Sequence, residues 1–445
     1  MKYLLYICRI LVGATFIVSG LVKANDPLGF SYKLEEYFEP SALGMAWAVP
    51  YALPLAILAC LAEVVLGFAV LVGGRMKLAT WTLLLLTLFF GWLTAYTATC
   101  DPQGKYEAVE NGVKVMKDVT CVTDCGCFGD AMKGSIGRSL TPWESFSKDM
   151  ILLVFVLPIF FFRKRILFNT NADDIAVLPA GLVVLAVWCW VFGWWFPMGF
   201  ALAGLAGYLV IKRLLQGPRA EWITAAFITA ISFGFIWYCW QHLPVKDYRP
   251  YAVGKSILAQ MKESVPPTQK IYVVYKNKDT GEQKEFDSAG KYPWDDTLHW
   301  AYVDRRIDVL DPGKPSLVQD FRLTDKDGVD ITNDVLNEPT PIILIVAKNI
   351  DKAETKCQPA INALAAEAFK AGWYVYGGSS SSYEQIEEFR HANQNPFDYV
   401  TCDETTLKTM IRSNPGVVLL RNGVVMGQWH CNDVPSFEEV KGRVK

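Results

Sequence analysis

Four cysteines lie in one short polar stretch between long apolar runs, and their spacing could support thiol chemistry. Cys100 is followed by Cys121, Cys125 and Cys127, and Gly126 separates the last two. A Cys-Gly-Cys pair closes only a very small ring, so its disulfide should be strained and easily reduced. Gly126 lets the backbone bend that tightly. We predict a catalytic redox loop in which Cys125 and Cys127 react and Cys121 or Cys100 relays.

Two other interpretations of this loop stay open. Two static disulfides could staple it, or four thiolates could bind zinc, although the spacing lacks the paired Cys-x-x-Cys knuckles usual in zinc sites. We therefore expect no metal. The remaining cysteines of the apolar runs are expected to be small packing residues: Cys8, Cys60, Cys189 and Cys239.

The apolar runs around the loop predict a membrane domain. The chain has 445 residues, 52% of them hydrophobic and 20% charged, and its long uncharged runs end near residue 241. A spanning helix needs about 20 apolar residues. The net charge of -2 gives no basic field for nucleic acid. Seven spans are predicted at residues 3–22, 50–73, 78–99, 142–162, 175–195, 200–211 and 222–240, with a tight turn at 196–199.

Basic residues between these runs predict the orientation. They form three groups: Arg75 and Lys77, residues 163–165, and residues 212–219. Placing all three in the cytoplasm puts the N-terminus inside and the cysteine loop and the tail outside, where disulfides persist. We expect a bacterial inner-membrane protein with an uncleaved first helix. If residues 175–211 crossed only once, giving six spans, the tail would be cytoplasmic.

Three charged residues interrupt the predicted spans or lie at their ends. Such residues are costly in a membrane and usually face the bundle interior. We expect Arg9 and Glu63 to meet, forming either a polar pocket for a quinone head group and its protons, or a structural ion pair. Asp149, beside Lys148, is expected in the interface.

After residue 245 the sequence becomes polar and predicts soluble structure. Residues 271–275 and 283–286 flank a turn and predict a β-hairpin within a linker or small insert, 245–315. From residue 316 the pattern is strand–helix–strand–helix–hairpin–helix. The hairpin, 416–420 and 424–429, has Asn422-Gly423 at its turn. This order resembles the thioredoxin fold.

Further motifs support that resemblance, but the usual active site is missing. Asp320-Phe321 with Asp327-Gly328 resembles the opening of peroxiredoxin and TlpA-like members, and Asn414-Pro415-Gly416 resembles their cis-proline site. Thioredoxins carry Cys-x-x-Cys before the first helix, whereas residues 354–360 contain only Cys357. We predict a one-cysteine site, a thiol-binding module or a degenerate docking scaffold. Two other cysteines of the tail are expected to be ordinary buried thiols rather than partners of Cys357: Cys402 and Cys431.

The N-terminal part also resembles a family. Residues 9–23 and 26–30 resemble the first helix and loop of DoxX-like membrane proteins, and residues 125–129, Cys-Gly-Cys-Phe-Gly, resemble the loop of the related MauE methylamine-utilisation proteins. The resemblance covers roughly residues 1–165 and implies a four-helix bundle. It also implies a link to quinones, and for MauE a link to disulfide formation in a periplasmic enzyme.

Taken together, we expect a multi-pass α-helical membrane protein followed by an α/β thioredoxin-like domain. The expected parts are a four-helix bundle at 1–165, about three further helices at 166–244, the insert at 245–315 and the domain at 316–445. Loop thiols would pass electrons to a quinone near Arg9 and Glu63, while the tail holds a client or an envelope partner. The alternative is a non-enzymatic scaffold with structural loop disulfides; a transporter is a third.

Overall fold

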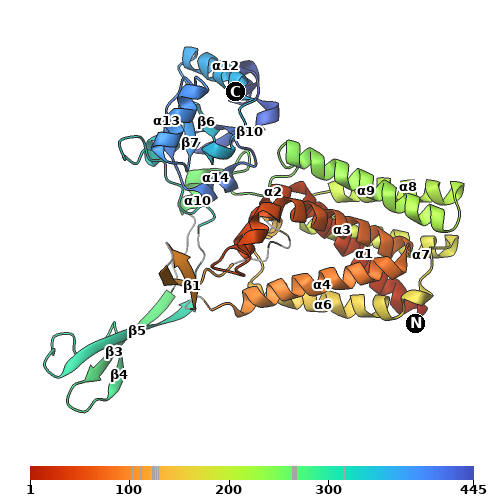
Figure 1. The fold of residues 1–445 in the computed structure, drawn as a ribbon, viewed down its shortest axis with the longest axis horizontal. Coiled ribbons are helices and arrows are strands. Elements are labelled where there is room, and N and C mark those ends of the chain that lie inside the picture. The colour runs from red at the N-terminus through yellow and green to blue at the C-terminus, as the bar shows by residue number, and fades with distance from the viewer. Residues whose placement is uncertain are drawn as a thin grey trace.

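The computed structural model describes residues 1–101, 104–110, 113–122, 126, 128, 130–262, 268–311, 313 and 316–444. Cys125 and Cys127 lie outside the described residues. Figure 1 shows a helical bundle, a projecting β-sheet and a C-terminal α/β domain at the end of the bundle away from the N-terminus. The two-part organisation expected from the sequence is therefore present.

Long helices lie side by side in the bundle (Figure 1). They are α1 (Lys2–Asn25), α3 (Ala52–Val72), α4 (Met76–Thr99), α6 (Pro142–Phe161), α7 (Asn171–Val191), α8 (Phe196–Leu214) and α9 (Pro218–Gln241). Within the described residues, five stretches are long and apolar enough to cross a membrane: Lys2–Asn25, Ala46–Val72, Met76–Thr99, Asn171–Val191 and Pro218–Gln241. The chain is a multi-pass helical membrane protein.

Two helix starts show how local sequence sets these boundaries. Thr141 and Glu144 form the capping box expected at the start of α6. The turn predicted at 196–199 is wrong, because α8 already begins at Phe196 and Pro197 lies in its first turn. Proline is tolerated there since the first amides of a helix need no intrahelical partner, and the chain turns just before, around Gly193.

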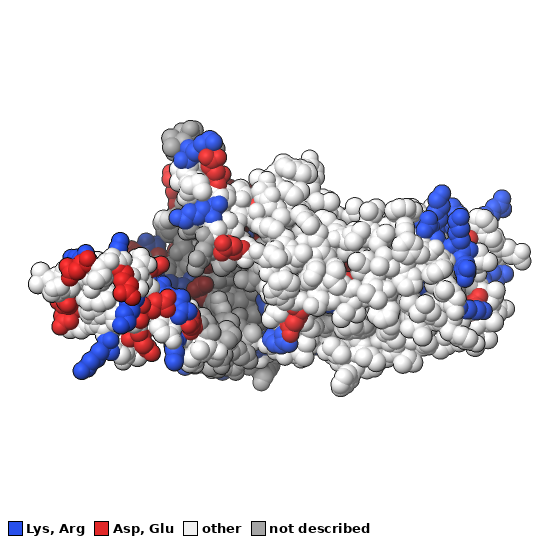
Figure 2. Space-filling view, turned by 90° about the horizontal axis from the view of Figure 1, so that it is seen from below, with Lys and Arg blue, Asp and Glu red and all other residues white. Residues whose placement is uncertain are grey.

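Basic residues gather at one end of the bundle. Figure 2 shows them at one end, followed by a wide band without charge and then by mixed charges at the other end. Arg163 lies over the ring of Trp81, and the backbone N–H of Arg75 donates to Glu221. The three basic groups therefore meet at the end opposite the C-terminal domain, and the uncharged band matches what lipid chains require.

A close helix contact joins α1 to α3 through two glycines. A Cβ added at Gly13 would lie 2.9 Å from the Gly67 carbonyl oxygen, and one added at Gly67 would lie 2.8 Å from the Gly13 carbonyl oxygen. Small residues that let backbones approach are a main source of helix association in membranes. The same two helices carry Lys23 and Glu63, which meet in the cavity described below.

Replacing Gly67 with Val should therefore separate α1 from α3. We expect a loss of about 1–3 kcal/mol, the usual cost of overpacking, seen as a lower unfolding temperature of the detergent-solubilised protein. Gly234→Val in α9 is the matched control, because a Cβ there meets nothing within 4 Å. Equal destabilisation by both variants would contradict the packing role.

The β-insert forms a three-stranded antiparallel sheet. Strands β3 (Thr268–Asn277) and β4 (Gln283–Asp287) make the predicted hairpin, which is confirmed. The strand β5 (Trp300–Asp311) pairs with the other edge of β3, and the sheet projects from the molecule (Figure 1). Strand β5 was not predicted, because four charged residues interrupt its apolar pattern: Asp304, Arg305, Arg306 and Asp308.

The C-terminal domain has a five-stranded sheet in the order β10-β9-β6-β7-β8. Its strands are β6 (Ile342–Val346), β7 (Tyr374–Ser379), β8 (Tyr399–Thr401), β9 (Gly416–Arg421) and β10 (Val424–His430). The helices α12 (Gln358–Lys370) and α13 (Tyr383–Ala392) connect β6, β7 and β8, which are parallel, whereas β9 is antiparallel to both of its neighbours, β6 and β10. This is the predicted thioredoxin fold. The Asn414–Pro415 peptide bond is cis, so that prediction is also confirmed.

The central strand, β6, is a continuous run of apolar residues because both of its faces are covered. All five residues of β6 are buried. Ile343 and Ile345 pack in one core, and Leu344 packs in the core on the other face. A strand covered on both faces needs no alternation of apolar and polar residues.

The structure also has shorter helices and strands: α2 (Pro27–Phe38), β1 (Lys105–Glu110), β2 (Val113–Asp118), α5 (Asp130–Ile136), α10 (Ile257–Lys262), α11 (Thr332–Asn337), α14 (Glu404–Met410) and α15 (Phe437–Gly442).

An ordered connection leads from α9 into the domain. The side-chain amide of Asn25 donates to the carbonyl of Lys246 and accepts from its backbone N–H. The hydroxyl of Tyr248 donates to the Phe192 carbonyl at 3.1 Å. The connection is thus fastened to α1 and to the end of α7 before the domain begins.

Candidate functional site

The cysteine loop between α4 and α6 carries a disulfide between Cys100 and Cys121, with their Cα atoms 5.8 Å apart. Cys100 caps the end of α4, so the bond fastens the loop to the bundle. A four-cysteine zinc site is therefore wrong, because two of its ligands are bonded to each other. The role of Cys125 and Cys127 stays a prediction.

Described residues on either side of these cysteines fix where the loop runs. Gly126 is buried, and a Cβ there would lie 3.1 Å from Cγ of Lys33 on α2. Phe128 is 6% exposed and packs against Trp188 and Phe192 of the bundle. Asp130 lies 3.6 Å from Arg412 of the C-terminal domain. The loop therefore passes between the bundle and the domain.

A cavity of about 200 Å³ lies beside this loop, inside the bundle. Lys23 and Glu63 meet there, with Nζ and Oε1 2.5 Å apart and side chains 4% and 3% exposed. The second carboxylate oxygen, Oε2, is buried without a hydrogen-bond partner among the described residues. Such an atom is costly unless something binds it. The rest of the lining is Leu11, Thr15, Phe16, Ser19, Thr87, Phe90, Phe128, Lys148, Asp149, Ile151, Leu152, Phe155 and Trp188.

Arg9 lies elsewhere, so the predicted pair between Arg9 and Glu63 is wrong. The Arg9 guanidinium donates to the carbonyls of Val70 and Leu71, at 2.9 and 2.8 Å. These carbonyls end α3, where a cation satisfies acceptors that the helix leaves open. Glu63 precedes Val70 by two turns, about 10 Å along the helix, and its partner is Lys23.

The surroundings of Arg9 are a closed polar network. Its guanidinium also donates to Asn169 Oδ1 at 2.6 Å, and the Asn169 amide donates to Asp174. Asp174 accepts further bonds from Tyr208 at 2.9 Å and from Lys212 at 2.5 Å. The polar side chains named here all have hydrogen-bond partners within the network, as expected of a structural network rather than a binding site. It ties α7 and α8 to α1.

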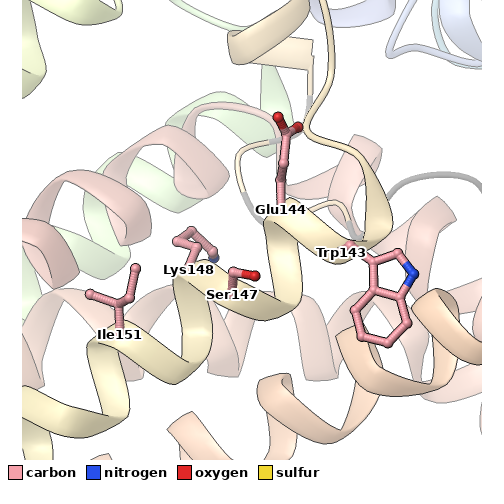
Figure 3. A pocket seen from close by; sticks show the side chains of 5 residues that line it. All are labelled: Trp143, Glu144, Ser147, Lys148 and Ile151. Atoms are coloured by element: carbon pink, nitrogen blue, oxygen red, sulfur yellow. The ribbon is translucent and has the colours of Figure 1, made fainter.

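Asp149 was expected in the interface, but it is buried in the cavity wall at 2% exposure. It accepts from Lys148 at 2.8 Å and from the Thr94 hydroxyl at 3.0 Å, and burial is possible because both partners compensate the charge. A shallow hollow lies along the first turns of α6, and Figure 3 shows the side chains that line it. Lys148 and Ile151 line both this hollow and the cavity. The hollow therefore adjoins the cavity from the side of the bundle.

The domain docks through a buried arginine. Nε of Arg412 lies 2.9 Å from both carboxylate oxygens of Asp26, which precedes α2. Its guanidinium stands over the ring of Tyr32, whose hydroxyl is 2.6 Å from Nζ of Lys348. Lys348 is itself 7% exposed. Three cationic side chains thus meet α2, the third being Lys408, which lies 3.7 Å from Glu35.

This contact predicts pH dependence. Burial, together with repulsion from Arg412, Lys408 and Arg249 that Asp26 only partly offsets, lowers the pKa of Lys348 to about 7 from 10.5. Between these pH values the folded protein binds fewer protons than the unfolded chain, so stability rises with pH from about 7 to 10. We expect the difference in unfolding temperature, wild type minus Lys348→Met, to increase over this range. A constant difference would contradict a buried, titrating Lys348.

A second disulfide joins Cys357 to Cys431, with Cα atoms 5.5 Å apart and a sequence separation of 74 residues. The prediction that Cys431 is an ordinary thiol is wrong. No local pattern pairs these cysteines, because only the register of β10 beside β9 and β6 brings Cys431 to the start of α12. Other predicted packing cysteines are free and buried, as expected: Cys8, Cys60, Cys189, Cys239 and Cys402.

Fold and site together define a multi-pass helical membrane protein that carries a thioredoxin-fold domain. Residues 1–102 match the family model of the methylamine utilisation protein MauE, which confirms the resemblance over the first three long helices. No curated protein sequence matches the chain.

Solved structures resemble the C-terminal domain. The thioredoxin domain of a thiol-disulfide oxidoreductase from Bacteroides vulgatus is 14% identical, with 28% of this chain and 92% of that one covered and a TM-score of 0.24. Peroxiredoxin Q from Xanthomonas campestris is 18% identical, with 29% and 96% covered and a TM-score of 0.23. StoA from Bacillus subtilis is 19% identical, with 28% and 96% covered and a TM-score of 0.22.

Proposed function

We propose that this protein oxidises the thiols of its outer loop and passes the electrons to a quinone bound inside the bundle. One observation carries the proposal. Phe128, which follows Cys127 directly in the chain, lines the cavity that holds the Lys23–Glu63 pair. Loop and cavity are therefore neighbours, and a ligand in the cavity is within reach of the loop.

The chemistry of the cavity fits a quinone ring. Aromatic side chains of Phe90, Phe128 and Phe155 offer flat apolar walls. The Lys23 ammonium can donate to a quinone oxygen, and the unpartnered Glu63 Oε2 can accept from a quinol hydroxyl. The hollow on α6 shares Lys148 and Ile151 with the cavity, so a lipid-soluble molecule would enter from this side.

The electron balance is simple. The Cys125 and Cys127 dithiol becomes a disulfide and releases two electrons and two protons, and the quinone takes up both to become a quinol. Lys23 and Glu63 bind the quinone ring and lie next to the oxygens that take up the protons. Arg9 takes no part, because its hydrogen-bond network is complete. Cys100 and Cys121 keep the loop fastened to α4.

Orientation follows from charge. The basic groups at the end opposite the domain support a cytoplasmic N-terminus and an outward-facing domain. A membrane-impermeant thiol or amine label added to intact cells should then modify a tag on the C-terminus. Labelling only after permeabilisation would overturn this orientation.

The test uses the full chain in lipid nanodiscs. After reduction and removal of the reductant, it should reduce a short-chain benzoquinone, followed by quinone absorbance, and form one loop disulfide per quinone consumed. Cys125→Ser with Cys127→Ser should abolish the reaction, whereas Cys239→Ser, a buried cysteine of α9, should not. An unchanged rate in the double variant would overturn the proposal.

A second candidate is a non-enzymatic scaffold that recruits an envelope protein. Both described cysteine pairs form disulfides, which favours the scaffold because each disulfide joins two segments of the chain. Thiol trapping in isolated membranes distinguishes the two. In a scaffold, Cys125 and Cys127 keep one state before and after an oxidised quinone is added.

A further inference from the structure

We propose that the Cys357–Cys431 disulfide is a second thiol–disulfide exchange centre, which carries electrons from a protein dithiol of the envelope to the outer loop. This inference rests on the proposed function and names the donor side of the same reaction. It replaces the missing Cys-x-x-Cys with two cysteines that are 74 residues apart.

The bond occupies the start of the first domain helix. Cys357 is the N-cap of α12, a helix of 13 residues. Three residues earlier, the N–H of Glu354 donates to the carbonyl of Asn414 at 2.8 Å. Cys431 begins η4 (Cys431–Asp433) and meets Cys357 there. The pair therefore lies between the helix start and the loop of Pro415.

The two sulfurs have unlike surroundings, which assigns their roles. Cys357 stands at the positive end of α12, which favours a thiolate. Sγ of Cys431 instead lies 3.9 Å from the Glu354 carboxylate, which pairs with Lys356 at 2.5 Å, and no helix N-terminus stabilises a thiolate on this sulfur among the described contacts. Cys357 is thus the attacking sulfur, and Cys431 is the one that resolves the mixed disulfide.

The bond lies just below the surface. The two cysteines are 4% and 5% exposed, yet their neighbours are exposed, namely residues 354–356 on one side and 432–433 on the other. A small movement of these neighbours uncovers sulfur.

The same neighbours contact the bundle. The Asn432 amide donates to the Gln241 carbonyl at 2.6 Å, and Asp433 pairs with His242 at 2.7 Å, both at the end of α9. The Cys431 N–H donates to Ser413 Oγ, and the preceding Arg412 reaches Asp130 of the outer loop. The centre therefore lies at the edge of the contact with the loop.

The exchange balances in two steps. An envelope dithiol attacks the Cys357–Cys431 bond and leaves as a disulfide, and the domain keeps two electrons and two protons as two thiols. The Cys357 thiolate then attacks the loop disulfide, and Cys431 displaces the loop from the mixed disulfide. The domain is oxidised again, and the loop dithiol is ready for the quinone.

Two single variants test this in the full chain in nanodiscs. Cys357→Ser and Cys431→Ser both remove the bond, so a structural staple gives them the same phenotype. We expect both to lose quinone reduction driven by a reduced dicysteine peptide. Only Cys431→Ser should accumulate a mixed disulfide, mapped by mass spectrometry from Cys357 to the loop or to the peptide. Cys402→Ser should behave as wild type.

The outcomes separate this inference from the proposed function. The inference is overturned if the two variants behave alike, or if the wild-type bond stays oxidised in trapped membranes while Cys125 and Cys127 change state. If the domain pair changes state and the loop never does, the proposed function fails, and the exchange centre stands with another acceptor. If tryptic digestion shows that both variants are unfolded, thiol trapping of the wild-type protein in isolated membranes decides between these outcomes.

Discussion

Arg412→Gln should release the C-terminal domain from the bundle. Its side chain is 6% exposed, and it meets both oxygens of Asp26 and approaches Asp130. Removing one partner of a buried ion pair costs about 3–5 kcal/mol, because the remaining charge is left in a poor solvent. We expect the docking equilibrium to weaken by roughly a hundredfold or more.

Hydrogen–deuterium exchange of α2 measures this release, because the amides around Tyr32 and Glu35 lie under the domain. Their exchange should accelerate in Arg412→Gln while the amides of β6 inside the domain keep their protection. Arg322→Gln is the matched control, since its ion pair with Asp330 is exposed, at 67% and 43%, and such pairs contribute about 0–1 kcal/mol. Unchanged exchange of α2 in Arg412→Gln would show that other contacts hold the domain.

Lys23→Met should destabilise the bundle more than any other single change in the cavity. Glu63 would then be buried without Lys23, whose Nζ lies 2.5 Å from its Oε1. Loss of one member of a buried pair costs about 3–5 kcal/mol. We expect a lower unfolding temperature of the detergent-solubilised protein.

The double variant Lys23→Met with Glu63→Leu separates stability from function. Replacing a whole buried pair by apolar residues is often neutral or stabilising, so the double variant should unfold near the wild-type temperature. Quinone reduction should nevertheless be lost, because no donor and no acceptor remain in the cavity. A folded double variant that still reduces quinone would remove the cavity from the mechanism.

The sequence predicted elements whose signals are local. The apolar runs gave the bundle, the capping box placed the start of α6, and Asn422-Gly423 placed the hairpin turn of β9 and β10. The resemblance of residues 414–416 placed the cis-proline. Each of these signals is complete within a few neighbouring residues, so no knowledge of the tertiary structure was needed.

The candidate site depends on contacts that no local pattern encodes. Lys23 directly follows the span predicted at 3–22, yet it is buried beside Phe30 of α2 and pairs with Glu63. Cys357 and Cys431 meet only because three strands align. Neither the Lys23–Glu63 pair nor the Cys357–Cys431 pair was predicted, because contacts between distant residues depend on tertiary packing, which the periodicity of the sequence does not reveal.

The ordered connection after α9 has a consequence for how tightly the domain is held. Because residues 242–250 are fastened to Asn25 and Phe192, the domain is tethered a few residues from its docking surface. Short tethers give effective concentrations on the order of millimolar, so a weak interface suffices to keep the domain docked. A soluble protein that binds the docking face of the domain would have to compete against that local concentration.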